Sequence, residues 1–121
     1  MKILLVDDNN RFRGILREIL KLKDDITVIE AISGHEALEI LKEEKVNLII
    51  SDYLMVGMNG MKLLQKIRSN PEHQNIPFIM ATGYPEDDLI SEIQSAGATF
   101  LQKPFLKETL FETIEKSTTK N

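Results

Sequence analysis

Residues 2–8 read KILLVDD, a run of apolar residues followed at once by two carboxylates. Apolar residues on consecutive positions predict a strand that is buried on both faces, as in a parallel sheet. The same pattern recurs twice farther along, as LIISD at 48–52 and FIMATG at 78–83. A short apolar run that ends in a polar or reactive residue is therefore the unit that decides the fold.

Between these runs lie longer stretches whose apolar residues recur at helical spacing, as Phe12, Ile15 and Ile19 do. Strands alternating with helices predict βα units and a parallel sheet. The expected strands are 2–6, 26–31, 46–51, 77–81 and 99–101. We expect an α/β fold, a single doubly wound (βα)5 domain over residues 1–121 with helices on both faces of the sheet. Residues 117–121 look like a polar, frayed tail.

Polar residues stand where these helices need N-caps, because their side chains can accept a hydrogen bond from a free backbone N–H. Asn9 or Asn10, Ser33 and Asn59 are the candidates. Pro85 suits a first helical turn, where no backbone N–H is required.

The composition fits one globular domain: 121 residues, 42% of them hydrophobic, with a net charge of −4. This acidic balance argues against direct nucleic-acid binding. The longest apolar runs are far shorter than the roughly 20 residues that span a membrane, so we expect no membrane partner. The absence of cysteine excludes disulfides and thiolate chemistry and is compatible with the reducing, cytoplasmic location that we expect.

Polar or reactive side chains follow four of the predicted strands. Asp7 and Asp8 follow the first, Asp52 the third and Thr82 the fourth, and Lys103 comes just after the fifth. Loops are polar in any protein. The carboxyl ends of parallel strands, however, share one edge of the sheet, which is where such folds bind ligands. The sequence therefore predicts a site at this edge.

Three carboxylates in one site repel one another unless a hard cation neutralises them. Mg²⁺ fits, because it binds through one or two carboxylates and leaves positions for water and phosphate oxygens. Helix capping is the alternative role for Asp8, although Asn9 and Asn10 could cap equally well.

The same groups suit phosphoryl transfer, which depends mostly on positioning and on neutralising charge. Asp52 is ionised at neutral pH and could attack phosphorus without a general base. Lys103 and the Thr82 hydroxyl could contact the phosphoryl oxygens. The product would be a labile aspartyl phosphate, which suits a signal.

These residues also resemble a known family. The matching motifs are Val6-Asp7-Asp8, Asp52 with Met55, Met58, Asn59 and Gly60, Ala81-Thr82-Gly83-Tyr84, Gly97-Ala98, Phe100 and Lys103-Pro104-Phe105. In this order they are similar to the receiver domain of two-component response regulators, the CheY-like domains, over essentially the whole chain. The resemblance implies the strand order 2-1-3-4-5.

The resemblance further implies that Asp52 accepts a phosphoryl group from a sensor histidine kinase or a histidine phosphotransfer domain. The reaction would require Mg²⁺, with Mn²⁺ as a substitute. Asp7, Asp8, Asp52 and the backbone carbonyl of Leu54 would hold the metal. The domain would be a phosphoacceptor and not an enzyme, since it would catalyse only its own phosphorylation and dephosphorylation.

In the same family Thr82 and Lys103 would bind the phosphoryl group, and Thr82 and Phe100 would form a conformational switch. Kinase or phosphotransfer partners would meet the first helix. An output partner or a second copy would meet the face of the fourth helix, fifth strand and fifth helix. Val56 stands where the family commonly has proline, and Phe100 replaces a frequent tyrosine.

Two other functions stay open at this stage. A small Mg²⁺-dependent phosphatase would use an aspartyl nucleophile, but usually in a D-x-D element after the first strand. A receiver-like interaction module would act without phosphorylation. Met55, Met58 and Met61 could form an adaptable binding surface, although packing in the core is the favoured interpretation.

Overall fold

The computed structural model describes residues 1–83 and 86–119, and within them strands and helices alternate strictly. The elements are β1 (Lys2–Val6), α1 (Asn10–Leu20), β2 (Thr27–Ala31), α2 (Gly34–Glu43), β3 (Leu48–Asp52), α3 (Gly60–Ser69), β4 (Phe78–Thr82), α4 (Asp87–Ser95), β5 (Thr99–Gln102) and α5 (Lys107–Thr118). This is the single (βα)5 arrangement that the sequence predicts.

All strand pairs are parallel, and the sheet order is β2-β1-β3-β4-β5, as expected. The chain leaves β1 toward one side of the sheet and later continues from β3 toward the other side. The order therefore reverses between β1 and β3, which is the point where open α/β sheets bind ligands. The register sets Val6 beside Ser51 and Asp52 beside Ala81, so the residues after β1, β3 and β4 emerge at one edge.

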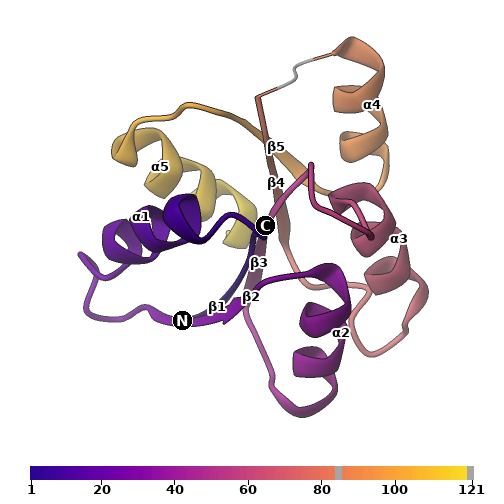
Figure 1. Ribbon diagram of the computed structural model, residues 1–121, viewed down its shortest axis with the longest axis horizontal. Coiled ribbons are helices and arrows are strands. Elements are labelled where there is room, and N and C mark those ends of the chain that lie inside the picture. Colours follow the sequence, from indigo (N-terminus) through magenta and orange to yellow (C-terminus); the bar gives the residue numbers. More distant parts are fainter. Residues whose placement is uncertain (84–85, 120–121) are drawn as a thin grey trace.

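Alternate residues of each strand enter two separate cores. Ile3 and Leu5 pack on the face covered by α1 and α5, whereas Leu4 and Val6 pack on the face covered by α2, α3 and α4. Figure 1 shows these two groups of helices on opposite sides of the sheet. Burial on both faces explains why the strands carry consecutive apolar residues.

Three of the predicted N-caps are confirmed. Asn9, Ser33 and Asn59 each accept a hydrogen bond from the backbone N–H three residues later. Asn10, the other candidate for the first cap, is instead the first residue of α1. The helix start expected at Pro85 lies outside the described residues.

The main differences from the sequence prediction are at the ends of elements. Asp52 and Thr82 are the last residues of β3 and β4, not the residues that follow them. The ladder continues through Asp52 because the backbone N–H of Tyr53 donates to the carbonyl of Ala81 at 2.9 Å, and through Thr82 because its carbonyl accepts from the N–H of Lys103 at 2.8 Å. Both side chains are thus held by the sheet itself.

The prediction of a frayed tail over residues 117–121 is wrong for its first two residues. Ser117 and Thr118 belong to α5, and residues 120 and 121 lie outside the described part of the chain. The Ser117 hydroxyl donates to Oγ1 of Thr99 at 3.1 Å, and the Thr118 hydroxyl donates to a carbonyl one turn earlier. These bonds satisfy the polar side chains inside the last helical turn.

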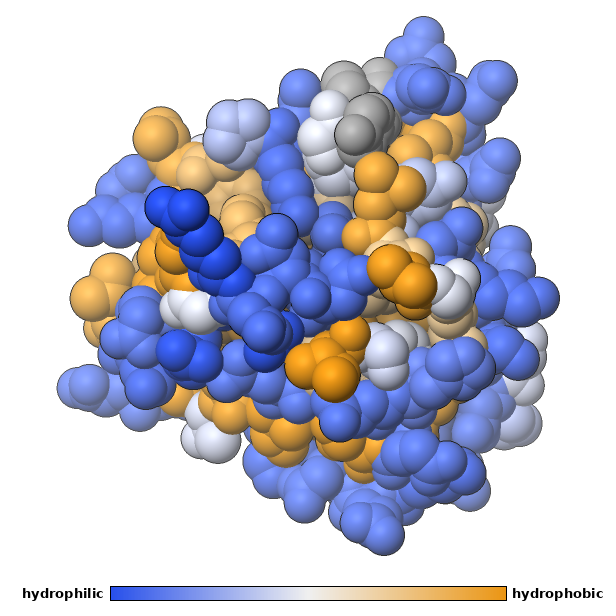
Figure 2. Space-filling model, in the orientation of Figure 1, coloured by the Kyte–Doolittle hydropathy of each residue, from blue (hydrophilic) through white to orange (hydrophobic). Residues whose placement is uncertain are grey.

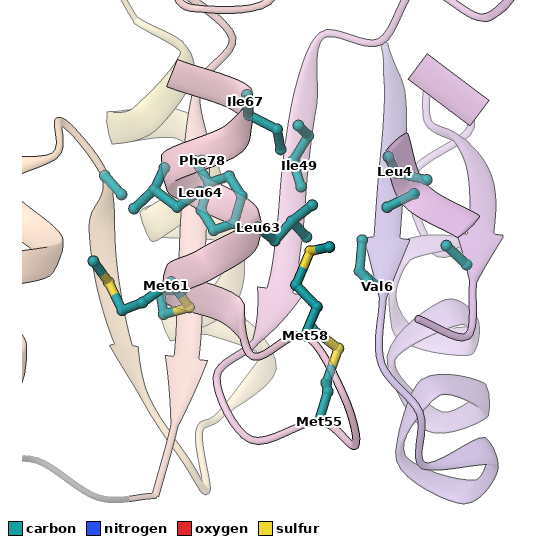
Figure 3. Packing of buried hydrophobic residues seen from close by; sticks show 14 of the residues in the cluster. Leu4, Val6, Ile49, Met55, Met58, Met61, Leu63, Leu64, Ile67 and Phe78 are labelled. Atoms are coloured by element: carbon teal, nitrogen blue, oxygen red, sulfur yellow. The ribbon is translucent and has the colours of Figure 1, made fainter. Parts of the chain in front are cut away.

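The three methionines around α3 are core residues. Met55, Met58 and Met61 are at most 9% exposed and belong to the cluster under α2, α3 and α4. In Figure 3 Met55 and Met58 come from the loop before α3 and point into this core. The favoured interpretation from the sequence, packing in the core, is confirmed.

Candidate functional site

Three of the predicted residues meet at the carboxyl edge of the sheet. The Lys103 ammonium lies 2.8 Å from Oδ1 of Asp52 and 3.9 Å from Oδ2 of Asp7. The Asp52 side chain is 12% exposed and that of Lys103 is 21% exposed. The pair is therefore partly shielded from water, which strengthens its attraction relative to a surface ion pair.

Asp8 completes an acidic cluster with Asp7 and Asp52. One oxygen from each of these carboxylates lies within 4.8 Å of the others. Asp7 is buried, Asp52 is partly buried and Asp8 is exposed, so the cluster opens toward solvent on one side. Carboxylate oxygens are the donors that hard divalent cations prefer, so the residues present fit Mg²⁺ or Mn²⁺.

Backbone N–H groups hold all three carboxylates. Asp7 accepts from the N–H of Asn9 at 2.9 Å, and Asp52 accepts from the N–H of the residue that follows it at 3.0 Å. Asp8 accepts from the N–H of Val56 at 2.8 Å, which joins the loop after β1 to the loop after β3. Sequence analysis missed this contact, because a backbone N–H leaves no signal in residue type.

Burial raises the pKa of the Asp7 carboxyl above its ordinary value of 3.8. The negative charges of Asp52 and Asp8 act in the same direction, while the Asn9 N–H and the Lys103 ammonium act against it. Asp7 thus carries an unfavourable charge in the metal-free protein. A cation in this cluster would remove that cost.

A hollow of about 370 Å³ lies beside the cluster and is lined by Asp52, Leu54, Thr82, Gly83 and Lys103. Of the lining residues, Thr82 is buried, whereas Leu54 is 50% exposed. A larger hollow of about 790 Å³ lies between α2 and α3, but no carboxylate lines it. Residue chemistry, not size, therefore makes the smaller hollow the candidate site.

An aromatic residue that sequence analysis assigned only to the core also touches the site. The Lys103 ammonium lies 3.9 Å from the centre of the Phe12 ring, within the range of a cation–π contact. Phe12 in turn packs edge to face with Phe105 at 6.1 Å. The helical spacing of Phe12 predicts its burial but not this contact, which depends on how the first turn of α1 faces the strand ends.

Gly60 allows the loop after β3 to return against the site. Its N–H donates to the Tyr53 carbonyl at 2.8 Å. A Cβ at this position would lie 2.5 Å from the Asp52 carbonyl oxygen, so the close approach requires glycine.

Phe100 is not among the residues that line the hollow. It is half-buried in β5, pairs with Met80 in the strand register and packs against the core under α2, α3 and α4. Tyr84, another residue of the matching motifs, lies outside the described residues.

Comparison with known proteins agrees with this fold. The family model of the response regulator receiver domain matches residues 3–115, and the chain belongs to this family. It is thus a CheY-like domain of two-component signalling, a family of signalling domains and not of classical enzymes.

Among its relatives, chemotaxis protein CheY-3 of Vibrio cholerae is 35% identical over 117 residues, which cover 96% of this chain and 90% of that protein. Sporulation initiation phosphotransferase F of Bacillus subtilis is 34% identical, and the match covers 95% of this chain and 91% of that protein. Among solved structures, the crystal structure of a putative response regulator from Chloroflexus aurantiacus matches with a TM-score of 0.91 at 27% identity. This match covers 98% of this chain and 98% of that chain.

Across residues 1–83 and 86–119, no helix is both long enough and apolar enough to cross a membrane.

Proposed function

We propose that this chain accepts a phosphoryl group on Asp52 from a phosphohistidine of a sensor kinase or phosphotransfer domain, in a reaction that requires Mg²⁺. The observation that carries the proposal is the position of the Lys103 ammonium, 2.8 Å from Asp52 at the edge of a three-carboxylate cluster. The proposal is supported by this arrangement, in which the carboxylate of the proposed nucleophile, Asp52, lies beside a positive group that can neutralise an incoming phosphate.

In the transfer step, an Asp52 carboxylate oxygen forms a bond to phosphorus while the nitrogen–phosphorus bond of the donor breaks. The electron pair of that bond returns to the donor imidazole, and a carboxylate nucleophile needs no general base for this step. Its Oδ1 already accepts from a backbone N–H and pairs with Lys103. The strand end and these contacts hold the carboxylate in one orientation before the donor arrives.

Asp7, Asp8, Asp52 and the Leu54 carbonyl are the groups that we propose to hold Mg²⁺, with Mn²⁺ as a substitute. When bound, the cation supplies positive charge against the carboxylates and the transferred phosphoryl oxygens. Lys103 supplies a second positive charge, and the hydroxyl of the buried Thr82 supplies a hydrogen bond to the phosphoryl group.

Phosphorylation would replace the Lys103–Asp52 pair with contacts to the phosphoryl group. We propose that Thr82 and Phe100 transmit this local change, because both lie on neighbouring strands at the side of α4. An output partner or a second copy would then bind the face of α4, β5 and α5. Direct binding to nucleic acid or to membranes is not part of this proposal.

The donor partner is proposed to meet α1, next to the site. Ile15 and Leu22 of this region are 52% and 62% exposed. On the face shown in Figure 2, apolar side chains form small separate groups among hydrophilic ones.

The proposal also places the chain in the cytoplasm, together with the phosphohistidine that serves as donor.

The test is the intact mass of the chain after incubation with acetyl phosphate, with Mg²⁺ or with EDTA. We expect one phosphoryl adduct that requires Mg²⁺, is removed by hydroxylamine and is absent from Asp52→Asn. A matched control is Asp87→Asn, an exposed carboxylate on α4, which should be phosphorylated normally. An adduct that persists in Asp52→Asn would refute the assignment, and a chain that no phosphodonor modifies would favour an unphosphorylated interaction module.

A further inference from the structure

Arg13 of α1 reaches the backbone that carries the acidic pair. Its Nη1 donates to the carbonyl oxygen of Asp7 at 2.8 Å, and its Nε donates to Oε1 of Glu30 on β2 at 2.9 Å. Its Nη2 donates to the Asn10 side chain at 2.8 Å. Only 13% of the side chain is exposed, so three hydrogen bonds hold the guanidinium in a partly buried position.

The contact with the Asp7 carbonyl restrains the backbone that carries both carboxylates. That carbonyl belongs to the peptide group joining Asp7 to Asp8, and a peptide group is planar. The other side of Asp7 is fixed as well, because its N–H donates to the Ala31 carbonyl at 3.1 Å. The hydrogen bond from Arg13 thus restrains the peptide plane that leads into Asp8.

We propose that Arg13 is a positioning residue for the cation site: anchored by Glu30, it sets the affinity for divalent cations by holding the Asp7–Asp8 peptide group. The inference rests on the proposed function, since it concerns the same metal site. Groups that orient metal ligands from behind commonly change metal affinity by about 10- to 100-fold when they are removed.

Charge and positioning predict opposite effects for the loss of Arg13. The guanidinium is positive, so electrostatics alone would make its removal favour binding of a cation. Loss of a positioning contact instead weakens binding. The direction of the change in affinity therefore separates the two roles.

Arg17 provides a matched control. Its guanidinium also pairs with Glu30, at 3.1 Å, and carries the same charge, but it donates its hydrogen bonds to Glu18 and Glu30 and not to the Asp7 carbonyl. Arg17→Met therefore removes an equivalent charge and a partner of Glu30 without freeing the Asp7 carbonyl.

The experiment titrates the full chain with MgCl2 and follows backbone amide shifts by NMR, which gives a dissociation constant without any phosphorylation. We expect Arg13→Met to raise that constant about tenfold and Arg17→Met to change it by less than about twofold. Arg13→Lys keeps the charge but has one nitrogen in place of the three that donate to Glu30, Asp7 and Asn10, so its constant should lie between those of the wild type and Arg13→Met. Should Arg13→Met not fold, the lysine variant alone tests the proposal.

A constant for Arg13→Met equal to or below that of Arg17→Met would overturn the positioning role, as would an Arg13→Lys constant at the wild-type value. In both cases a wild type that binds Mg²⁺ leaves the proposed function intact. A wild type that shows no Mg²⁺ binding refutes the metal site itself, and both proposals fail with it.

Discussion

Replacing Asp7 with asparagine should stabilise the metal-free protein. The Asp7 carboxylate is buried beside two other carboxylates, and burial raises its pKa. An asparagine has nearly the same shape, and its amide oxygen can still accept from the Asn9 N–H. The substitution therefore removes the charge while it keeps the packing.

The magnitude follows from the distances. At an effective dielectric constant of about 20, two like charges within the 4.8 Å of this cluster repel by about 3.5 kcal/mol, and Asp7 faces two of them. The Lys103 ammonium at 3.9 Å returns about 4 kcal/mol of attraction. Solvent around the exposed Asp8 weakens its repulsion, so we expect a net gain of about 1–2 kcal/mol in the free energy of unfolding. For a domain of this size, that gain corresponds to a rise in Tm of about 4–8 °C.

The gain should depend on pH. Because the folded-state pKa of Asp7 is raised, its unfavourable charge acts in full above that pKa. As the pH falls through the raised pKa toward the ordinary value of 3.8, the folded wild type takes up the proton and the cost disappears. The difference in Tm between Asp7→Asn and the wild type should therefore shrink from neutral pH to mildly acidic pH.

The assay is thermal unfolding of both proteins in EDTA and in excess Mg²⁺. We expect Asp7→Asn to have the higher Tm in EDTA and to gain less than the wild type from Mg²⁺. Asp52→Asn serves as comparison: it loses the 2.8 Å pair with Lys103 as well as the repulsion, so its gain should be smaller. A Tm of Asp7→Asn at or below the wild-type Tm in EDTA would refute the reasoning.

Three further substitutions test individual contacts. Arg68→Met should lower the free energy of unfolding by about 2 kcal/mol, because the guanidinium donates to three backbone carbonyls that would lose this donor. Urea denaturation measures the change, and an unchanged midpoint of the urea transition would contradict the prediction. Gly60→Ala should lower the Tm and slow phosphorylation by acetyl phosphate, since a Cβ would press on the Asp52 carbonyl; wild-type values of both would show that the loop yields freely. Phe12→Leu should slow phosphorylation by acetyl phosphate about two- to tenfold, because the ring beside Lys103 is lost. Phe12→Tyr keeps an aromatic ring and should restore the wild-type rate. Equal rates in the leucine and tyrosine variants would exclude the cation–π contribution.

The fold was accessible from the sequence because the two faces of each central strand must both be apolar. Leu4 and Leu5 pack into different cores on opposite faces of the sheet, which explains why consecutive residues of this strand are apolar. A strand with one face in solvent would need apolar residues only at alternate positions. The ends of elements were less accessible. Asp52 and Thr82 are residue types that are typical of loops, but β3 and β4 extend through them. The hydrogen bonds between the strands depend on the backbone and not on the side chains.

The candidate site was accessible to the extent that parallel topology determines it. Asp7, Asp52 and Lys103 follow or end strands, so the sheet brings them together. The contacts of Phe12 and Arg13 were missed, because helical spacing shows which residues face the sheet but not which atoms of the first turn reach the strand ends.

The most direct test of the central claim is the position of the phosphoryl group. Treatment of the phosphorylated chain with borohydride reduces an aspartyl phosphate to homoserine, and peptide mass spectrometry then locates the changed residue. We predict homoserine at Asp52 alone, in samples that contained Mg²⁺. Homoserine at Asp7 or Asp8, or phosphate retained on a histidine with Asp52 unchanged, would contradict the account.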